Sequence, residues 1–536
     1  MKSISILLQA AMIAACCVLS GWRLLHYFQL ESYQLDGYVR WLKKNHSRQS
    51  GALTIGVSAT AGYYALWLIL RVFLSAAASQ IAAGIIALIG FALFAVLLDR
   101  AFHMQPEKKP LTYTPRMKRL YAALIVIALL AALLIALVFR LPGFIVFVAA
   151  PYLPLAAGAC MKPVEKKISD HYLQDAKRRL DDRPDLIKIG ITGSYGKTST
   201  KFILATILSE KFDVLATPSS FNTPMGLTRV IREQLEKHHQ VFLAEMGARH
   251  VGDIRELVEL VHPRLGLLTS VGEQHLETFG DIETVANTKF ELVEGLPENG
   301  AAFFAADGAW VDKLYQRAAC EKFLTGTQGM GLDMKAEDIA VGAEGSRFTL
   351  SDKRTGEKIE CHTKLLGRHN IGNVTLACMV ARYLGLTMEE IARGVSRLEP
   401  VEHRLQLLSG ANGMTIIDDA FNSNPVGANA ALDVLSAFEG RRRVVVTPGM
   451  VEQGEKEAEI NRRFGAQMAG KCDEAILVGK KHTQPIVEGL RAGGMADEHI
   501  HVTASLDEAT AVLGQIGRPN DVVLFENDLP DNYNEK

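Results

Sequence analysis

The segment Ile189–Thr200, with the sequence IGITGSYGKTST, constrains this chain more than any other. An apolar stretch ends in a turn that contains glycines, and Lys197, Thr198 and an apolar helical pattern follow. A strand, a glycine-rich turn and a helix N-terminus form a cradle for phosphate groups, because backbone N–H groups can approach the anion closely. In such a cradle a lysine reaches outer phosphate oxygens and a hydroxyl ligates Mg²⁺. The segment therefore predicts an ATP-binding loop, shorter than the strict pattern, rather than a chance glycine turn before an ordinary helix.

Long apolar runs dominate the first 160 residues, whereas the remainder has the composition of an ordinary α/β protein. Five of these runs are candidate membrane spans: Ile4–Leu19, Leu53–Ala78, Ile81–Leu98, Leu120–Phe139 and Phe144–Ala159. The middle three reach the roughly 18–20 residues that a bilayer requires, and the first and last are marginal alone. Residues 1–160 are therefore predicted to form a membrane domain with about five transmembrane helices.

Basic residues are concentrated in two of the loops between these runs. The first loop holds Arg23, Arg40, Lys43, Lys44 and Arg48, and the third holds Arg100, Lys108, Lys109, Arg116, Lys118 and Arg119. Because basic loops stay on the cytoplasmic side, the N-terminus is predicted to lie outside and everything after residue 160 inside, where ATP is. We expect a multi-pass protein of the cell (inner or plasma) membrane.

Two features of this region have alternatives. The first run could be a signal peptide, but no small-residue cleavage site is evident and further runs follow. The segment His26–Asn45 mixes aromatic and charged residues, as an amphipathic helix at the membrane interface does. A helix packed against the other spans fits that pattern equally well.

Beyond a basic, helical-looking linker at 161–185, short apolar strands alternate with helical patterns. The predicted strands of a first series are Leu186–Ile191, Val214–Thr217, Val241–Glu245 and Leu265–Ser270, followed by a helix-rich stretch from Asp281 to Leu296. After a predicted hinge at Leu398–Glu402, a second series comprises Met414–Asp418, Val444–Thr447, Ala475–Val478 and Val522–Phe525. Such alternation is typical of parallel sheets. We predict an α/β ATP-binding domain at 186–400 and a smaller Rossmann-like α/β domain at 401–536.

Polar residues follow two of the predicted strands. Glu245 closes one strand, and His275 lies just past the next. Either residue could be a solvated loop residue, but ligands of open parallel sheets bind beyond the carboxyl ends of strands. Mg²⁺ takes carboxylate, hydroxyl and phosphate oxygens, so the pair predicts a magnesium site beside the nucleotide loop. Lys289, in the helical stretch that follows, has in isolation the pattern of a solvated helix lysine.

These motifs, in this order and spacing, resemble those of the Mur ligases. The resemblance rests on Thr192–Thr198, Glu245–Ala248, Val271–Glu277, Asn287–Glu291, Gly367–Asn373, Arg404 and Asp418–Pro425. It extends from Leu186 to Asp521 and is greatest to the branch that adds D-alanyl-D-alanine to the UDP-linked muramoyl tripeptide. The implied fold is a central P-loop ATPase domain followed by a smaller C-terminal domain.

The resemblance implies a role for each site residue by position. The residues that would bind the ATP phosphates are Thr192, Gly193, Ser194, Gly196, Lys197 and Thr198. The magnesium ligands would be Thr198, Glu245, His275 and Lys289, the last as a carbamate. Asn370 and Asn373 would contact the nucleotide, and Arg404 and Asp419 would reach its phosphate and ribose from the C-terminal domain. Lys197, Lys289, His275 and Glu245 would carry the chemistry, in which a carboxylate becomes an acyl phosphate and an amine then attacks it.

Some departures from the family leave the substrates open. Membrane runs occupy the place of the family's UDP-sugar domain, and Ala305-Ala306 stands where an asparagine is usual. The segment Leu524–Pro530 stands where a Lys-Gly-Ser segment is expected. We therefore expect a membrane-anchored, ATP- and Mg²⁺-dependent amide ligase of cell-wall precursor synthesis, acting on a small-molecule or lipid-linked precursor and an amine or amino acid. The alternatives are the D-alanyl-D-alanine-adding reaction itself, a poly-γ-glutamate-type synthetase, and, from another class, an ATP-driven transporter or inactive nucleotide-binding scaffold. The formal net charge of −1 argues against nucleic acid as a partner.

Overall fold

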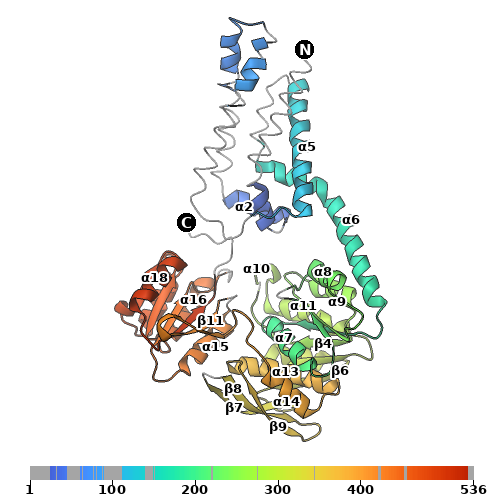
Figure 1. Cartoon of the computed structure of the whole chain (residues 1–536), viewed down its shortest axis with the longest axis vertical. Coiled ribbons are helices and arrows are strands. Elements are labelled where there is room, and N and C mark those ends of the chain that lie inside the picture. The colour runs from blue at the N-terminus through green and yellow to red at the C-terminus, as the bar shows by residue number, and fades with distance from the viewer. Residues whose placement is uncertain are drawn as a thin grey trace. The chain divides into compact units, whose positions relative to one another are not determined.

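The computed structural model divides the chain into two compact units, Met1–His171 and Tyr172–Lys536. The structure describes residues 24–31, 33–44, 61–62, 64–75, 78–79, 81–86, 89, 111–138, 149, 151–218, 221–274, 276–342, 345–420, 424–451 and 456–528. Figure 1 labels the helices and strands of both units.

The helices of the first unit pack around one apolar core. The named helices are α2 (Leu35–Lys44), α5 (Pro115–Val138) and α6 (Leu153–Asp181). Tyr38 and Leu42 of α2 are buried against Leu120 of α5 and Ala157 of α6. The Tyr38 hydroxyl donates to the carbonyl oxygen of Pro151 at 3.1 Å, which satisfies the polar end of this buried ring. Of the two alternatives for the segment that contains α2, the described residues favour the packed helix.

Within the described residues, Pro115–Ile135 is the one stretch of helix long and apolar enough to cross a membrane. Its outward side chains remain exposed, as for Val126 at 53% and Leu130 at 59%. This stretch corresponds to the predicted span Leu120–Phe139. One such helix is weak evidence for a single membrane anchor, because length and composition alone identify it.

The described residues do not support the predicted multi-pass arrangement. Ile4–Leu19 lies outside them altogether, and Leu53–Ala78, Ile81–Leu98 and Phe144–Ala159 lie partly outside. Helix in the second of these spans gives way to a turn at residues 71–73. The last span overlaps α6, which continues through the polar residues of the predicted linker to Asp181.

An ion pair explains how α6 extends beyond its apolar start. Arg119 of α5 binds both carboxylate oxygens of Glu165, with Nε–Oε1 at 2.6 Å and Nη2–Oε2 at 2.8 Å. The two-point geometry stabilises the polar continuation of α6 beside α5. The last turns of the same helix belong to the second unit, where Ala176 and Leu180 are fully buried.

The described strands of the larger domain in the second unit form a nine-stranded sheet in the order β2-β3-β1-β4-β5-β6-β7-β8-β9. These strands are β1 (Ile187–Thr192), β2 (Val214–Ala216), β3 (Val241–Glu245), β4 (Leu265–Leu268), β5 (Ala301–Ala305), β6 (Glu321–Gly326), β7 (Met334–Gly342), β8 (Gly345–Asp352) and β9 (Lys358–Thr363). Pairing is parallel from β2 to β7, and β7, β8 and β9 pair antiparallel. The four strands of the first predicted series match β1 to β4 closely, whereas the later strands of this sheet, including the antiparallel extension, are not part of that series.

Helices cover both faces of this sheet (Figure 1). They are α7 (Lys197–Leu208), α8 (Pro224–Glu233), α9 (Asp253–Val261), α10 (Leu276–Phe279), α11 (Ile282–Glu294), α12 (Ala309–Arg317), α13 (Arg368–Tyr383) and α14 (Met388–Ser396). Side chains of α7, α13 and α14 share one core with the sheet, and those of α8 and α9 share another on the opposite face. The domain is therefore a three-layer α/β structure.

A six-stranded sheet of order β10-β11-β15-β12-β13-β14 forms the smaller domain. Its strands are β10 (Gln406–Ser409), β11 (Thr415–Asp419), β12 (Arg443–Thr447), β13 (Glu474–Val478), β14 (Ile500–Thr503) and β15 (Val522–Glu526). Its helices are η2 (Ala411–Gly413), α15 (Pro425–Ser436), α16 (Glu457–Ala469), α17 (Gln484–Ala492), η4 (Asp497–His499) and α18 (Leu506–Ile516). All pairs are parallel except β10 with β11. The α/β class predicted for both domains is confirmed.

The β7–β8 hairpin provides a stability test with a matched control. Gly345 has φ of +124°, and a Cβ added there would lie 2.1 Å from the Thr363 carbonyl oxygen. Since this neighbour is backbone, we expect Gly345→Ala to lower the thermal unfolding midpoint by roughly 4 °C or more. Gly342→Ala, across the same hairpin, meets no atom within 4 Å and should shift it by less than about 1 °C. Equal shifts in the two variants, measured by circular dichroism, would contradict this account.

Candidate active site

The turn between β1 and α7 has the backbone of a phosphate cradle. Gly193 has φ of +150° and Gly196 has φ of +80°, which glycine adopts without strain. A Cβ on Gly193 would lie 2.1 Å from Thr269 Oγ1, and one on Gly196 would lie 2.8 Å from Asn373 Oδ1. Both glycines are therefore required by close packing as well as by conformation. Asn373, on α13, lies directly against the loop, as its predicted place beside the nucleotide requires.

Hydrogen bonds fix this loop to the neighbouring strand ends. The Ser194 N–H donates to the Ser270 carbonyl oxygen at 2.8 Å, and the Ser194 hydroxyl accepts from the Gly272 N–H at 2.9 Å. The Thr192 hydroxyl donates to the Met246 carbonyl oxygen at 3.0 Å. The side chains of Thr192 and Ser194 thus hold the loop in shape. Because the N–H groups of Ser194 and Tyr195 both donate to Ser270, the part of the loop backbone that can meet a ligand is the part next to α7.

Lys197, the first residue of α7, curls back over the loop. Its ammonium donates to the carbonyl oxygens of Gly193 at 2.8 Å and Ser194 at 3.1 Å. Burial lowers the pKa of Lys197 to about 8. The lysine therefore lies within the cradle and remains mostly protonated near neutral pH.

Glu245, the last residue of β3, is the centre of a buried polar cluster. Its Oε1 accepts from Thr198 Oγ1 and Asn222 Nδ2, both at 3.1 Å. Its Oε2 accepts from Lys201 Nζ at 3.0 Å, and both members of this ion pair are almost inaccessible to solvent. Sequence reasoning missed Lys201 and Asn222. The signal for Lys201 was a lysine one helical turn after Lys197 on a largely apolar helix.

Lys289, on α11, is buried rather than solvated, so the interpretation of it as an ordinary surface lysine is wrong. Only 2% of its surface is exposed. Burial, and then the nearby charge of Lys197, lower the pKa of Lys289 to about 7. Its amine is therefore largely neutral above pH 7, which is the form that can react with CO₂.

The predicted magnesium ligands are only partly within the described residues. His275 lies outside them. Among the described residues, no group of three His, Cys, Asp or Glu side chains is arranged around a metal position. The hydroxyl of Thr198 against the carboxylate of Glu245 provides two hard oxygen ligands at a helix N-terminus, which is the donor set that Mg²⁺ prefers. These two residues therefore fit a magnesium ion.

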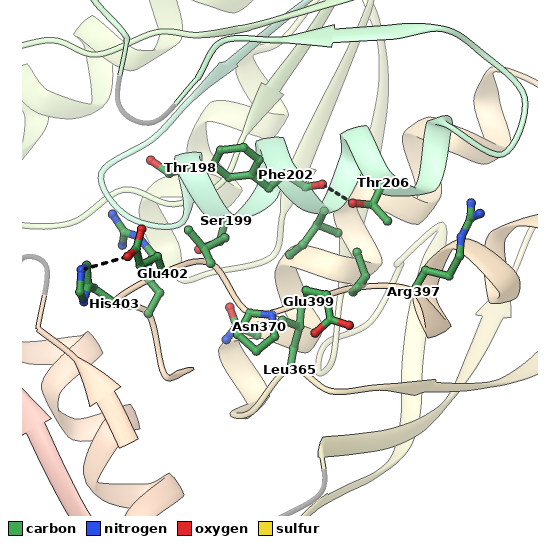
Figure 2. Close-up of a pocket in the computed structure, with 15 residues that line it drawn as sticks. Thr198, Ser199, Phe202, Thr206, Leu365, Asn370, Arg397, Glu399, Glu402 and His403 are labelled. Carbon is green, nitrogen blue, oxygen red and sulfur yellow. Dashed lines mark hydrogen bonds and ion pairs between the residues drawn. The ribbon is translucent and has the colours of Figure 1, made fainter. Parts of the chain in front are cut away.

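A cavity of about 530 Å³ lies beside α7 (Figure 2). Ser199, Phe202 and Thr206 line it from α7, Asn370 lines it from α13, and the segment from Arg397 to Arg404 completes it. Its volume lies in the range of small-molecule sites. The Asn370 amide donates to the Leu366 carbonyl oxygen at 2.8 Å, which fixes this side chain in the wall.

Arg404 and Asp419 come together at the end of β11. The backbone N–H of Leu405 donates to Asp419 Oδ1 at 3.2 Å. Burial raises the pKa of Asp419 to about 6, against the opposing effects of that hydrogen bond and the charge of Arg404. Burial lowers the pKa of Arg404, whose charge interacts with both Asp419 and Glu245. The structure thus brings this arginine from the smaller domain into the electrostatic environment of the phosphate loop.

Comparison with known proteins identifies the family. The Mur ligase middle domain matches residues 191–381, and the Mur ligase glutamate ligase domain matches residues 403–526. The chain belongs to the Mur ligase family. It is therefore an ATP-dependent, amide-bond-forming ligase of peptidoglycan precursor synthesis.

The related proteins place it near one branch of this family. A UDP-N-acetylmuramoyl-tripeptide--D-alanyl-D-alanine ligase of Mycobacterium bovis is 32% identical over 359 residues, 63% of this chain and 69% of that protein. The ligase of the same name from Bacillus subtilis is 29% identical over 67% of this chain and 75% of its own length. The crystal structure of the MurF ligase of Thermotoga maritima in complex with ADP shares the fold, with a TM-score of 0.61 and 24% identity over 68% of this chain and 81% of that one. This Mur ligase is MurF-like in its middle and C-terminal domains.

The pKa of Lys289 gives a prediction that needs no turnover. We expect ¹³C-labelled bicarbonate to produce a carbamate NMR signal that grows from about pH 6 to about pH 8, because deprotonation frees the amine lone pair. Lys289→Arg should abolish the signal, since a guanidinium does not form a carbamate. Lys313→Arg, an exposed lysine on α12, is the control and should retain it. A signal of unchanged size in Lys289→Arg would contradict the assignment.

Proposed function

We propose that this Mur ligase joins a carboxylate to an amine at the edge formed by the β1–α7 loop, the end of β3 and the segment around Arg404. The observation that carries the proposal is the cluster around Glu245. There a carboxylate, a hydroxyl and a buried ammonium meet beside a glycine-shaped loop at a helix N-terminus. The loop N–H groups would bind the β- and γ-phosphates of ATP, with Lys197 turning from the loop carbonyls to the phosphate oxygens.

In the proposed reaction, an oxygen of the substrate carboxylate attacks the γ-phosphorus, and the bond to the β-phosphate oxygen breaks. The products of this step are an acyl phosphate and ADP. The amine then attacks the acyl carbon, phosphate leaves with the C–O bond electrons, and the amine loses a proton to form a neutral amide. Positive charge around the loop supports in-line transfer by balancing charge on the phosphoryl oxygens.

The proposed residue roles follow from this scheme. Thr198, Glu245 and His275 would hold Mg²⁺, which neutralises phosphate charge when bound. A carbamate on Lys289 would supply two further oxygens for a second ion. Asn370 and Asn373 would contact the nucleotide, while Arg404 and Asp419 would contact its phosphate and ribose. Closure of the smaller domain over the loop would exclude water from the acyl phosphate.

We further propose that the first unit anchors the ligase to the membrane and that the carboxylate substrate is lipid-linked. The exposed apolar side chains of α5 support the anchor, because contact with lipid would remove them from water. An anchored site gains encounter frequency with a substrate confined to the same membrane. The second candidate is addition of D-alanyl-D-alanine to the UDP-linked muramoyl tripeptide, which the similarity to ligases of that name favours.

The phosphate-loop assignment is tested by Lys197→Ala. We expect loss of at least about a hundredfold in ADP release, because the cradle loses the charge that balances the phosphoryl oxygens. The unfolding midpoint should change little, because the lost hydrogen bonds to two loop carbonyl oxygens are offset by relief of the desolvation that lowers the pKa of Lys197. Lys211→Ala, whose ammonium donates to the Gly385 carbonyl oxygen beyond the far end of α7, serves as the control and should retain activity. Activity of Lys197→Ala within a few-fold of the wild type would contradict the assignment.

The lipid-linked substrate is tested by removing the first unit. A protein that begins at Tyr172 keeps Ala176 and Leu180, which are buried in the core of the second unit, whereas a start at Asp182 would remove them. We expect the shortened protein to bind ATP like the full chain but to lose most activity on a lipid-linked muramoyl peptide in vesicles. Both proteins are compared with each precursor and D-alanyl-D-alanine by ADP release. Full activity of the shortened protein on the soluble UDP-linked tripeptide would favour the second candidate.

A further inference from the structure

Arg404 is flanked by two residues with left-handed backbone conformation. His403 has φ of +58° and Leu405 has φ of +48°. Side chains other than glycine, and bulky ones above all, rarely adopt this conformation. Two such residues around one arginine form a tight, strained turn that persists only where its surroundings hold it.

Both flanking residues are held by carboxylates at the end of β11. His403 Nδ1 lies 2.7 Å from Asp418 Oδ2. Because a carboxylate only accepts, Nδ1 carries the proton and donates it. The Leu405 N–H donates to Asp419 Oδ1 at 3.2 Å, and the Ala420 N–H donates to the other oxygen of Asp418 at 3.2 Å. Adjacent residues of one strand thus fix the turn on both sides of Arg404.

Arg404 lines the same cavity as Thr198 and Ser199, at the start of α7. The arginine charge acts on Lys197 and Lys201 of α7 and on Glu245 of β3, although Arg404 itself follows the hinge into the smaller domain. Release of His403 would let the backbone relax and carry the guanidinium away from the loop. A displacement of about 1 Å is enough to lower the rate of a positioned reaction by about a hundredfold.

We propose that His403 and Asp418 are positioning residues that aim Arg404 at the nucleotide by holding the left-handed turn. This inference rests on the proposed role of Arg404 and concerns two residues to which the family resemblance assigned no role. The smaller domain would then deliver its arginine through the end of one strand rather than through a flexible linker.

The test separates the hydrogen bond from the backbone strain. His403→Gly removes the side chain, and glycine adopts the left-handed conformation freely. A loss of activity in this variant therefore reports the hydrogen bond to Asp418. His403→Asn keeps a donor near the Nδ1 position and tolerates the left-handed conformation. We expect the glycine variant to lose about tenfold or more in kcat and the asparagine variant to stay within about threefold of the wild type. His262→Gly is the matched control, because His262 also has a left-handed backbone, φ of +48°, at the end of α9.

A double-variant comparison shows whether His403 acts through Arg404. In the Arg404→Ala background, His403→Gly should cost less than about twofold further in kcat. The same pattern should hold for binding of a non-hydrolysable ATP analogue to the full chain, measured by calorimetry without turnover. A multiplicative loss in the double variant, or failure of His403→Asn to restore activity, would overturn the proposal.

Two further variants keep the outcome interpretable. Arg404→Ala alone reports on the proposed role of the arginine, and full activity and analogue binding in this variant would overturn that role and the positioning proposal with it. A defect in Arg404→Ala with a fully active His403→Gly would overturn the positioning proposal only. If His403→Gly does not fold, Asp418→Asn replaces it, since the loss of charge weakens the same bond. Asp418→Asn should then lose activity only where Arg404 is present.

Discussion

The buried ion pair between Lys201 and Glu245 is the interaction on which the site depends. It joins the helix that begins at the phosphate loop to the strand that ends beside it, at an Nζ–Oε2 distance of 3.0 Å. Both groups are removed from water, so the loss of either partner would leave an isolated buried charge, which typically costs about 3–5 kcal/mol. With Oε2 occupied by Lys201, Oε1 is turned toward Thr198 and Asn222. The pair thereby fixes the position of α7 relative to the sheet and the orientation of the Glu245 carboxylate.

The parts of this arrangement that lie close together in the sequence were predictable. The β1–α7 loop has a local signature, because glycines, a lysine and a hydroxyl residue follow an apolar strand within a few positions. Glu245 was also predictable, since a carboxylate at the end of an apolar strand lies at the edge where parallel sheets bind ligands. The strand predictions succeeded for the same reason: buried parallel strands are short apolar runs bounded by turns.

The remaining parts depend on contacts between distant segments. Lys289 has the sequence pattern of a surface helix lysine, and only the packing of α11 shows that it is buried with a depressed pKa. The pairing of His403 with Asp418 joins a turn to a strand end, which no periodicity indicates. The antiparallel β7–β9 extension was missed because its strands are half exposed and were not counted among the apolar runs. Of the predicted spans, Leu120–Phe139 corresponds to a described helix long and apolar enough to cross a membrane, and the other four lie wholly or partly outside the described residues, so the count of five stays a prediction.

The boundary between the two α/β domains has one buried apolar contact and one exposed ion pair. Leu366, which precedes α13, is buried in the core of the smaller domain together with Leu405, so the chain crosses the boundary through apolar packing. Lys456 and Glu273 also form an ion pair across this boundary, at 3.3 Å, in which both side chains are at least half exposed. Exposed pairs of this kind contribute at most about 1 kcal/mol. Breaking the Lys456–Glu273 pair therefore costs little free energy, while the turn around Arg404 preserves the position of this arginine next to the apolar contact. A ligand that binds both the loop and Arg404 can shift such a balance with a few kcal/mol of differential affinity.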